Sequence, residues 1–122
     1  MIGYVTLGTN DLPRAAAFYD ALLAEIGAKR LWDFGTAIAW GVSQDKPSLG
    51  ITKPYDGKAA TVGNGVMVAL QAKDKAQVDR IYKLAMSMGA QDEGKPGPRS
   101  DTFYAAYFRD PDGNKLNAFV MG

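Results

Sequence analysis

The sequence predicts an α+β fold made of two copies of one βαβββ module. Residues 67–74 repeat the strand-like pattern of residues 4–11, and a helix-like run follows each of them. The two helix-like runs carry aromatic residues in equivalent places, at Phe18-Tyr19 and at Ile81-Tyr82. A period this long indicates a duplicated unit rather than a solenoid of many short repeats. Each copy is too small to bury a good core alone, so we expect the copies to share one core, with a cleft where they meet.

The first copy is predicted to occupy residues 1–53. Its strands are expected at residues 2–8, 29–34, 36–42 and 48–53, and its helix from about residue 12 to residue 26. Asn10 or Asp11 caps the helix, Pro13 lies in its first turn and Gly27 ends it. The second and third strands form a hairpin that turns near Phe34-Gly35, and each carries one tryptophan.

The second copy is predicted to occupy residues 65–122, after a Gly- and Pro-rich linker at residues 54–64. Its strands are expected at residues 66–72, 102–109 and 114–120, and residues 91–100 are expected to be part strand and part mobile loop. Asp74 caps its helix and Gly89 ends it. Residues 110–113 form a tight turn before the last strand.

Composition places the chain among ordinary globular domains. Of its 122 residues, 47% are hydrophobic and 22% are charged, and 14 basic against 13 acidic residues give a net charge of +1. This balance argues against a nucleic-acid or membrane partner. No apolar run approaches the ~20 residues of a membrane span, and the chain opens with a strand pattern rather than a signal peptide. We therefore expect a cytoplasmic protein.

The chain contains no histidine and no cysteine. These residues are the usual ligands of zinc and other transition metals, and histidine is the commonest general base near neutral pH. Only a metal site made entirely of oxygen ligands would remain, and only two of the acidic residues, Glu25 and Glu93, are glutamates. We therefore expect no metal, no other cofactor and no imidazole-based triad.

Three segments together resemble the vicinal oxygen chelate superfamily, which contains glyoxalase I, bleomycin resistance proteins and extradiol dioxygenases. They are Val5-Thr6-Leu7 with the following Asn10–Arg14 and Phe18-Tyr19, then Gly63-Asn64-Gly65 leading into Val68-Ala69-Leu70, and finally Phe108–Asn114. The resemblance spans nearly the whole chain. It implies two curved mixed sheets, one for each module, that are paired around a cleft.

The resemblance also implies where metal ligands would project, and these positions hold unsuitable residues. The first-strand positions fall on Tyr4 and Met67, and the glutamate of the final strand falls on Asn117. The fourth-strand position of the first module lies within residues 49–52, where no acid occurs. A phenol, a thioether and an amide would not hold a divalent ion.

Strand alternation selects the residues that face the cleft. Val5, Leu7, Val68 and Leu70 are expected to pack on the helices, which turns Tyr4, Thr6, Met67 and Ala69 toward the concave face. The same argument places Phe103, Tyr107, Lys115 and Asn117 in the cleft, and Phe108 and Leu116 against a helix. Trp32 and Trp40 fit either the core or the pocket. Arg99 is a candidate anion clamp, with a solvated loop charge as the alternative.

Three classes of function remain open. The first is a metal-free binding protein of the bleomycin-resistance type, which holds a flat or amphipathic small molecule on aromatic side chains. The second is a glyoxalase-like lyase or isomerase, related to lactoylglutathione lyase, that acts on a small thiol conjugate. The third is a non-catalytic regulatory or scaffold dimer. In each case we expect a homodimer, because short curved sheets leave edges to cover.

Overall fold

The structure is a computed structural model that describes residues 1–122, and it forms two compact units, Met1–Val62 and Gly63–Gly122. Each unit contains one helix and one four-stranded mixed sheet, so the predicted α+β class and the βαβββ repeat are confirmed. The N-terminal unit comprises β1 (Tyr4–Gly8), α1 (Leu12–Ala24), β2 (Lys29–Asp33), β3 (Ala37–Gly41) and β4 (Ser48–Thr52). The C-terminal unit comprises β5 (Val68–Gln71), α2 (Lys75–Ser87), β6 (Gln91–Ser100), β7 (Phe103–Arg109) and β8 (Lys115–Met121).

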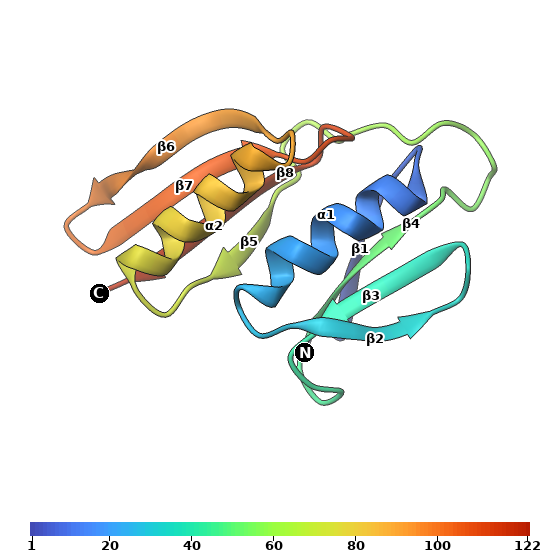
Figure 1. The fold of residues 1–122 in the computed structure, drawn as a ribbon, viewed down its shortest axis with the longest axis horizontal. Helices are drawn as coiled ribbons and strands as arrows, with labels where there is room; N and C mark the ends of the chain where they lie inside the picture. Colours follow the sequence, from blue (N-terminus) through green and yellow to red (C-terminus); the bar gives the residue numbers. More distant parts are fainter. The chain divides into compact units, whose positions relative to one another are not determined.

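The two sheets have equivalent topology. Their strand orders are β1-β4-β3-β2 and β5-β8-β7-β6, and in each the first strand pairs in parallel with the last while the other pairs are antiparallel. Figure 1 shows α1 lying across one face of the first sheet and α2 across one face of the second. The helices pack on the second, third and fourth strands of their own units. Each sheet therefore has one face covered by its helix, and we call the opposite face the helix-free face.

The start and end of α1 follow from its local sequence. Asp11 is the N-cap, and its carboxylate accepts the N–H of Arg14 at 3.1 Å, as is usual for a capping aspartate. At the other end, Gly27 has a φ of 80°, and the N–H of Ala28 donates to the carbonyl of Leu23 at 3.0 Å. A left-handed residue at this position lets the chain turn back and satisfy the last helical carbonyls.

Helix α2 repeats this arrangement in the C-terminal unit. Asp74 caps it by accepting the N–H of Gln77 at 2.8 Å, and Gly89 ends it with a φ of 93°. Its buried stripe includes Val78, Ile81 and Ala85, each fully shielded from solvent. The stripe rests on β7 and β8, where Phe108, Leu116 and Ala118 are also fully buried.

Two sequence-based expectations were wrong. Residues 91–100 form strand throughout rather than part loop, because β6 is an edge strand, where Pro96 and Pro98 need no ladder partner on the open side. Three shifts in its pairing with β7 accommodate the irregular sequence. Val5 is 39% exposed instead of packed on a helix, because α1 rests on β2, β3 and β4 rather than on β1.

The turn before β8 is held by the side chain of Asp110. This residue is buried, and one carboxylate oxygen accepts the N–H groups of Asp112 and Asn114, each at 2.9 Å. The other oxygen accepts the side-chain amide of Asn114 at 3.0 Å. Gly113 supplies the positive φ, 95°, that the turn requires. The motif therefore has a structural role.

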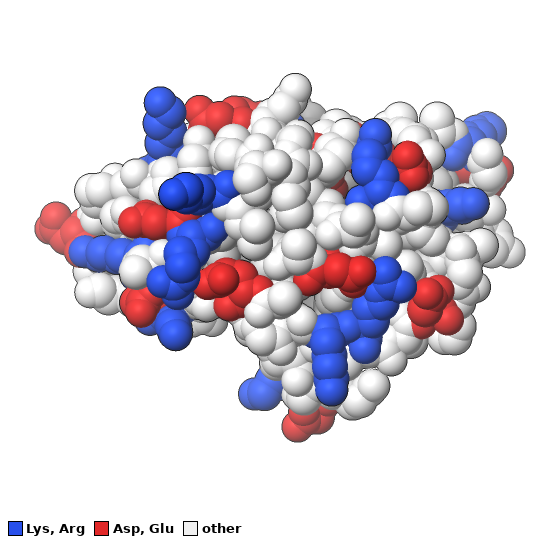
Figure 2. Space-filling model, viewed as in Figure 1, with Lys and Arg blue, Asp and Glu red and all other residues white.

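Charge is distributed evenly over the surface in view. Figure 2 shows basic and acidic side chains interspersed, without a large area of one sign. Neither helix is both long enough and apolar enough to cross a membrane.

Candidate ligand-binding site

The helix-free face of the C-terminal unit gathers most of the residues that the sequence predicted for a site. Tyr107 pairs directly with Asn117, and Ala69 pairs with Asn117 from the other side. Directly opposed residues share one face of a sheet, and their neighbours Phe108, Leu116 and Ala118 are buried on the helix side. The structure therefore turns Tyr107, Asn117 and Ala69 away from α2, as strand alternation predicts.

Tyr107 lies between two cationic side chains. The Arg99 guanidinium is 5.3 Å from the centre of its ring, and the Lys115 ammonium is 5.6 Å from it. Arg99 belongs to β6 rather than to a loop, and it donates to the carbonyls of Gly97 and Lys95, both at 2.8 Å. These bonds hold the guanidinium in place over the ring, so the face presents an aromatic surface flanked by positive charge.

Asn117 contributes an unused hydrogen-bond acceptor. Its side chain is 2% exposed, and its amide oxygen has no hydrogen-bond partner in the protein. A buried acceptor without a partner costs roughly 1–3 kcal/mol, so few such atoms occur in folded proteins. This unpaired acceptor lies on the same face of the sheet as Tyr107, directly opposite it in the neighbouring strand.

Phe103 and Met67 extend this face toward its two ends. Phe103 stacks on Phe119, with ring centres 5.6 Å apart and an angle of 18° between the rings. Met67 is 40% exposed and lines a hollow of about 320 Å³ together with Arg109, Lys115 and residues 63–66. Met67 is therefore not buried beneath a helix, and its thioether is accessible.

The helix-free face of the N-terminal unit carries a cluster of three aromatic rings. Tyr4 contacts Trp32 edge-on at 6.1 Å between ring centres, and Trp32 stacks on Phe34 at 4.9 Å. Tyr4 is 61% exposed and Phe34 is 75% exposed. The sheet next to the cluster carries small residues. Thr6, Gly50 and Ala39 lie side by side across three strands, since Thr6 pairs with Gly50 and Gly50 pairs with Ala39. The cluster is thus an accessible aromatic surface on a floor of small residues.

A β-bulge decides which tryptophan joins this cluster. Arg30 pairs with Trp40, but Trp32 pairs with Ala39, so Leu31 is an extra residue between them. Without the bulge, Arg30 and Trp32 would lie on the same face of the strand. The extra residue turns Trp32 to the helix-free face and leaves Arg30 beside α1.

Trp40 does not belong to the site, contrary to one of the two possibilities that the sequence left open. It is 1% exposed and lies on the helix side, where its indole N–H donates to the Asp20 carboxylate at 2.8 Å. Arg30 also donates to Asp20, at 2.8 and 2.9 Å, and this bonding lowers the pKa of that carboxyl below its ordinary value. Trp40 is therefore a core residue in a polar network with α1.

The residues present do not fit a divalent metal ion. Tyr4 and Met67 occupy the first-strand positions, and the amide of Asn117 occupies the final-strand position. The register makes Gly50, which has no side chain, the counterpart of Asn117 in the N-terminal unit. No group of three or more His, Cys, Asp or Glu side chains is placed to hold a metal. The phenol of Tyr4, the thioether of Met67 and the amide of Asn117 lack the charge and basicity that a divalent metal ion needs from its ligands.

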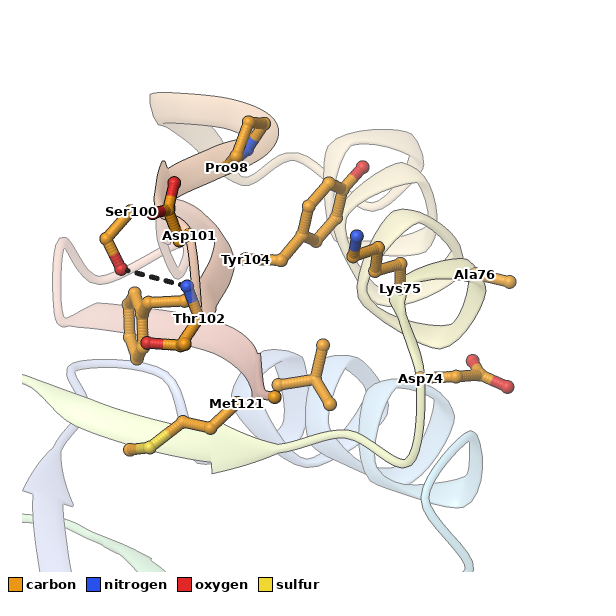
Figure 3. Close-up of a pocket in the computed structure, with 12 residues that line it drawn as sticks. Asp74, Lys75, Ala76, Pro98, Ser100, Asp101, Thr102, Tyr104 and Met121 are labelled. Carbon is orange, nitrogen blue, oxygen red and sulfur yellow. Dashed lines mark hydrogen bonds between the residues drawn. The ribbon is translucent and has the colours of Figure 1, made fainter.

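A separate hollow of about 600 Å³ lies at one end of the C-terminal sheet (Figure 3). It is bounded by the start of α2, the turn between β6 and β7, and the end of β8. Tyr104 donates its hydroxyl to Asp79 at 2.8 Å, which raises the pKa of the tyrosine, and the Lys75 ammonium lies 5.6 Å from its ring. Acidic residues, Asp74 and Asp101, also line this hollow.

The model of the Glyoxalase/Bleomycin resistance protein/Dioxygenase superfamily matches residues 1–118. This chain belongs to that superfamily. A glyoxalase/bleomycin resistance protein from Albidiferax ferrireducens T118 is 36% identical, with 98% of this chain and 97% of that one covered and a TM-score of 0.89. None of the curated proteins compared with the chain is a significant match.

Two more distant structures share the fold. The fosfomycin resistance protein FosX from Mesorhizobium loti is 17% identical, with 100% of this chain and 92% of that chain covered and a TM-score of 0.71. Lactoylglutathione lyase from Agrobacterium tumefaciens is 22% identical, with 98% and 92% covered and a TM-score of 0.68. At these identities the likeness concerns the fold alone.

Sequence reasoning missed two residues of the helix-free faces. The sequence pattern places Phe34 at the end of a strand and at its turn, with no role in a site, yet Phe34 completes the aromatic cluster with Trp32 and Tyr4. Gly94 allows close packing, since a Cβ atom there would come within 3.2 Å of both Tyr107 and Arg99. A glycine in the middle of a strand pattern often marks such a close approach, and it was the available signal.

Proposed function

We propose that this protein binds a small aromatic or amphipathic molecule on the helix-free faces of its sheets, without a metal ion. The observation that carries the proposal is the unpaired amide oxygen of Asn117, next to a tyrosine that two cations flank. This combination offers an acceptor for a ligand donor, a ring for stacking and positive charge for an anionic group. The aromatic cluster of Tyr4, Trp32 and Phe34 is a second surface on which a flat ligand can stack.

The alternative of a metal-dependent lyase or isomerase has less support. Its chemistry would need ligands at positions that Tyr4, Met67, Gly50 and Asn117 occupy. The likeness to lactoylglutathione lyase shows a common fold, and function depends on the residues of the site rather than on the fold. A scaffold role would require that the polar and aromatic helix-free faces bind no small molecule.

Binding of the anionic aromatic dye 8-anilinonaphthalene-1-sulfonate, followed by its fluorescence, tests the proposal. Tyr107→Leu removes the ring, and its loss should weaken binding about two- to tenfold, as expected for ~0.5–1.5 kcal/mol of stacking. Met67→Trp should fill the neighbouring hollow and abolish binding. Tyr82→Leu is the matched control, because Tyr82 is a half-buried tyrosine of the same unit that lies on α2 and not on the helix-free face.

A second arm addresses the metal. Treatment with EDTA should leave the dissociation constant unchanged, and elemental analysis after dialysis should find less than one zinc, nickel, iron or manganese per chain. Equal binding by wild type and Tyr107→Leu, or a loss of binding with EDTA that zinc restores, would contradict the proposal. Native mass spectrometry of the purified protein can then identify a co-purified ligand.

We also propose that the chain forms a homodimer. Strands β1, β2, β5 and β6 are all sheet edges, and edge strands present unpaired backbone groups. Large apolar side chains near these edges are exposed, including Ile2, Val5 and Val66. Sedimentation velocity between 1 and 100 µM, on the order of usual working concentrations, should show a dimer. A monomer at every concentration would refute this proposal and leave the ligand proposal intact.

A further inference from the structure

A second hollow in the N-terminal unit has the features of an anion-binding site. Its volume is about 600 Å³, and it lies where α1 begins, beside the turn between β2 and β3 and the loop that follows β4. The residues that line it are Thr9, Asn10, Thr36, Thr52, Lys53, Pro54, Tyr55, Gly57, Lys58 and Ala59. All of them belong to one compact unit, and none is among the ligand-binding residues named above.

The charge of this lining is entirely positive. It includes two lysines, Lys53 and Lys58, and no aspartate or glutamate. Neither ammonium group forms an ion pair within the protein. Asp56 accepts the backbone N–H of Lys58 at 2.9 Å, and its side chain is not part of the lining. Both ammonium groups are therefore available to an anion that enters the hollow.

The wall of the hollow is held in place before any ligand arrives. The side-chain amide of Asn10 accepts from the N–H of Ala60 at 2.7 Å and donates to its carbonyl at 3.2 Å. These two bonds tie the loop after β4 to the start of α1. The backbone N–H of Lys53 donates to the carbonyl of Thr36 at 2.9 Å, which fixes the loop to the β2–β3 turn. A preformed wall lowers the entropy cost of binding.

Hydroxyl and aromatic groups complete the lining. The hydroxyl of Thr36 makes no hydrogen bond within the protein and lies on the exposed turn. The ring of Tyr55 is fully exposed at the edge of the hollow. The hydroxyl can donate to an anion, and the ring can stack on a flat group attached to it.

We propose that this hollow binds a small phosphate monoester that carries a ring. Two lysine ammonium groups match the double negative charge of a phosphate monoester better than the single charge of a carboxylate. The volume is larger than a phosphate group alone requires, and Tyr55 supplies a surface for the ring. The corresponding hollow of the C-terminal unit is lined by Asp74 and Asp101 beside a single lysine, Lys75, and should not bind the same ligand.

Backbone NMR of the ¹⁵N-labelled full chain, titrated with phenyl phosphate, tests this inference. The amide signals of Thr36, Thr52 and Lys58 should shift in a saturable manner, and phenol should cause no such shift. The double variant Lys53→Gln/Lys58→Gln should raise the dissociation constant about tenfold or more, because each ammonium makes a charge-assisted contact. The matched control is Lys29→Gln/Lys46→Gln, which removes the same charge from exposed positions of the same unit.

Three outcomes would overturn the proposal. They are an equal loss of affinity in the two double variants, shifts that map outside the hollow, and benzoate binding as tightly as phenyl phosphate. Amide spectra of the ligand-free variants that differ from wild type only near the substituted residues would show that the variants remain folded. The result does not depend on dye binding at Tyr107, so this proposal and the proposed function can fail separately.

Discussion

The two units of this protein share one framework but differ on the surfaces that the framework leaves open. Both have the same strand order, a parallel pair between the first and last strands, an aspartate N-cap and a glycine at the helix end. The helix-free face is neutral and aromatic in the N-terminal unit, with Tyr4, Trp32 and Phe34. In the C-terminal unit it combines Tyr107 with two cations and an unpaired amide.

The hollows at the helix starts differ in the same way. The N-terminal one is lined by two lysines and no acid, whereas the C-terminal one includes two aspartates. This comparison shows that packing under the helix determines the fold, while the open face and the sheet end can vary in chemistry.

The largest difference in the free energy of unfolding should separate variants of two adjacent residues on opposite faces of β7. Phe108→Ala empties a fully buried position under α2 and should lower the free energy of unfolding by about 3–5 kcal/mol. Tyr107→Ala should lower it by no more than about 1.5 kcal/mol, because the ring is only half-buried. Urea denaturation measures both. Equal losses would show that the helix-free face also carries the core of the unit.

A smaller difference should separate the two tryptophans of the N-terminal unit. Trp40→Phe removes a buried indole and its hydrogen bond to Asp20, which should cost about 1–3 kcal/mol. Trp32→Phe keeps an aromatic ring in the accessible cluster and should cost less than about 1 kcal/mol. If Trp32→Phe proved the more damaging variant, the bulge at Leu31 would not place the residue as described.

The smallest expected effect is on the pH dependence of stability, through the hydrogen bonds that Arg30 and Trp40 donate to Asp20. The bond from Arg30 holds the pKa of Asp20 below its ordinary value of 3.8. The Asp20 carboxylate therefore binds a proton more readily in the unfolded state than in the folded state. Its contribution to the free energy of unfolding is fully present above pH 3.8 and is lost as the pH falls through the lower pKa of the folded state. Because the side chain is 45% exposed, Asp20→Asn should cost only about 1 kcal/mol at pH 7.

Urea denaturation of wild type and Asp20→Asn at pH 7 and near pH 3 provides the measurement. The difference between the two proteins should shrink at the lower pH. A difference that stays constant across this range would mean that the Asp20 carboxylate does not stabilise the fold through its charge.

The helix-facing half of the structure was predictable because its signals are local. Asp11 and Asp74 cap helices through contacts three residues away, and Gly27 and Gly89 end them by their own conformation. The alternation that placed Tyr107, Asn117 and Lys115 on one face is also a short-range property of regular strands. In regular strands the sequence was sufficient for the face of a residue, but not for whether a helix covers it, as Val5 in β1 shows.

Where the chain departs from regularity, only the tertiary structure decided the outcome. The extra residue Leu31 reverses the face of Trp32, and an edge position lets the proline-containing β6 remain a strand. The sequence by itself determined the repeated βαβββ order, the helix ends and the absence of histidine and cysteine. Only the tertiary structure shows that Arg99 lies over Tyr107, that the amide oxygen of Asn117 is unpaired and that two lysines line one hollow. Such arrangements form only when strand register and loop path are set together, and no local pattern encodes them.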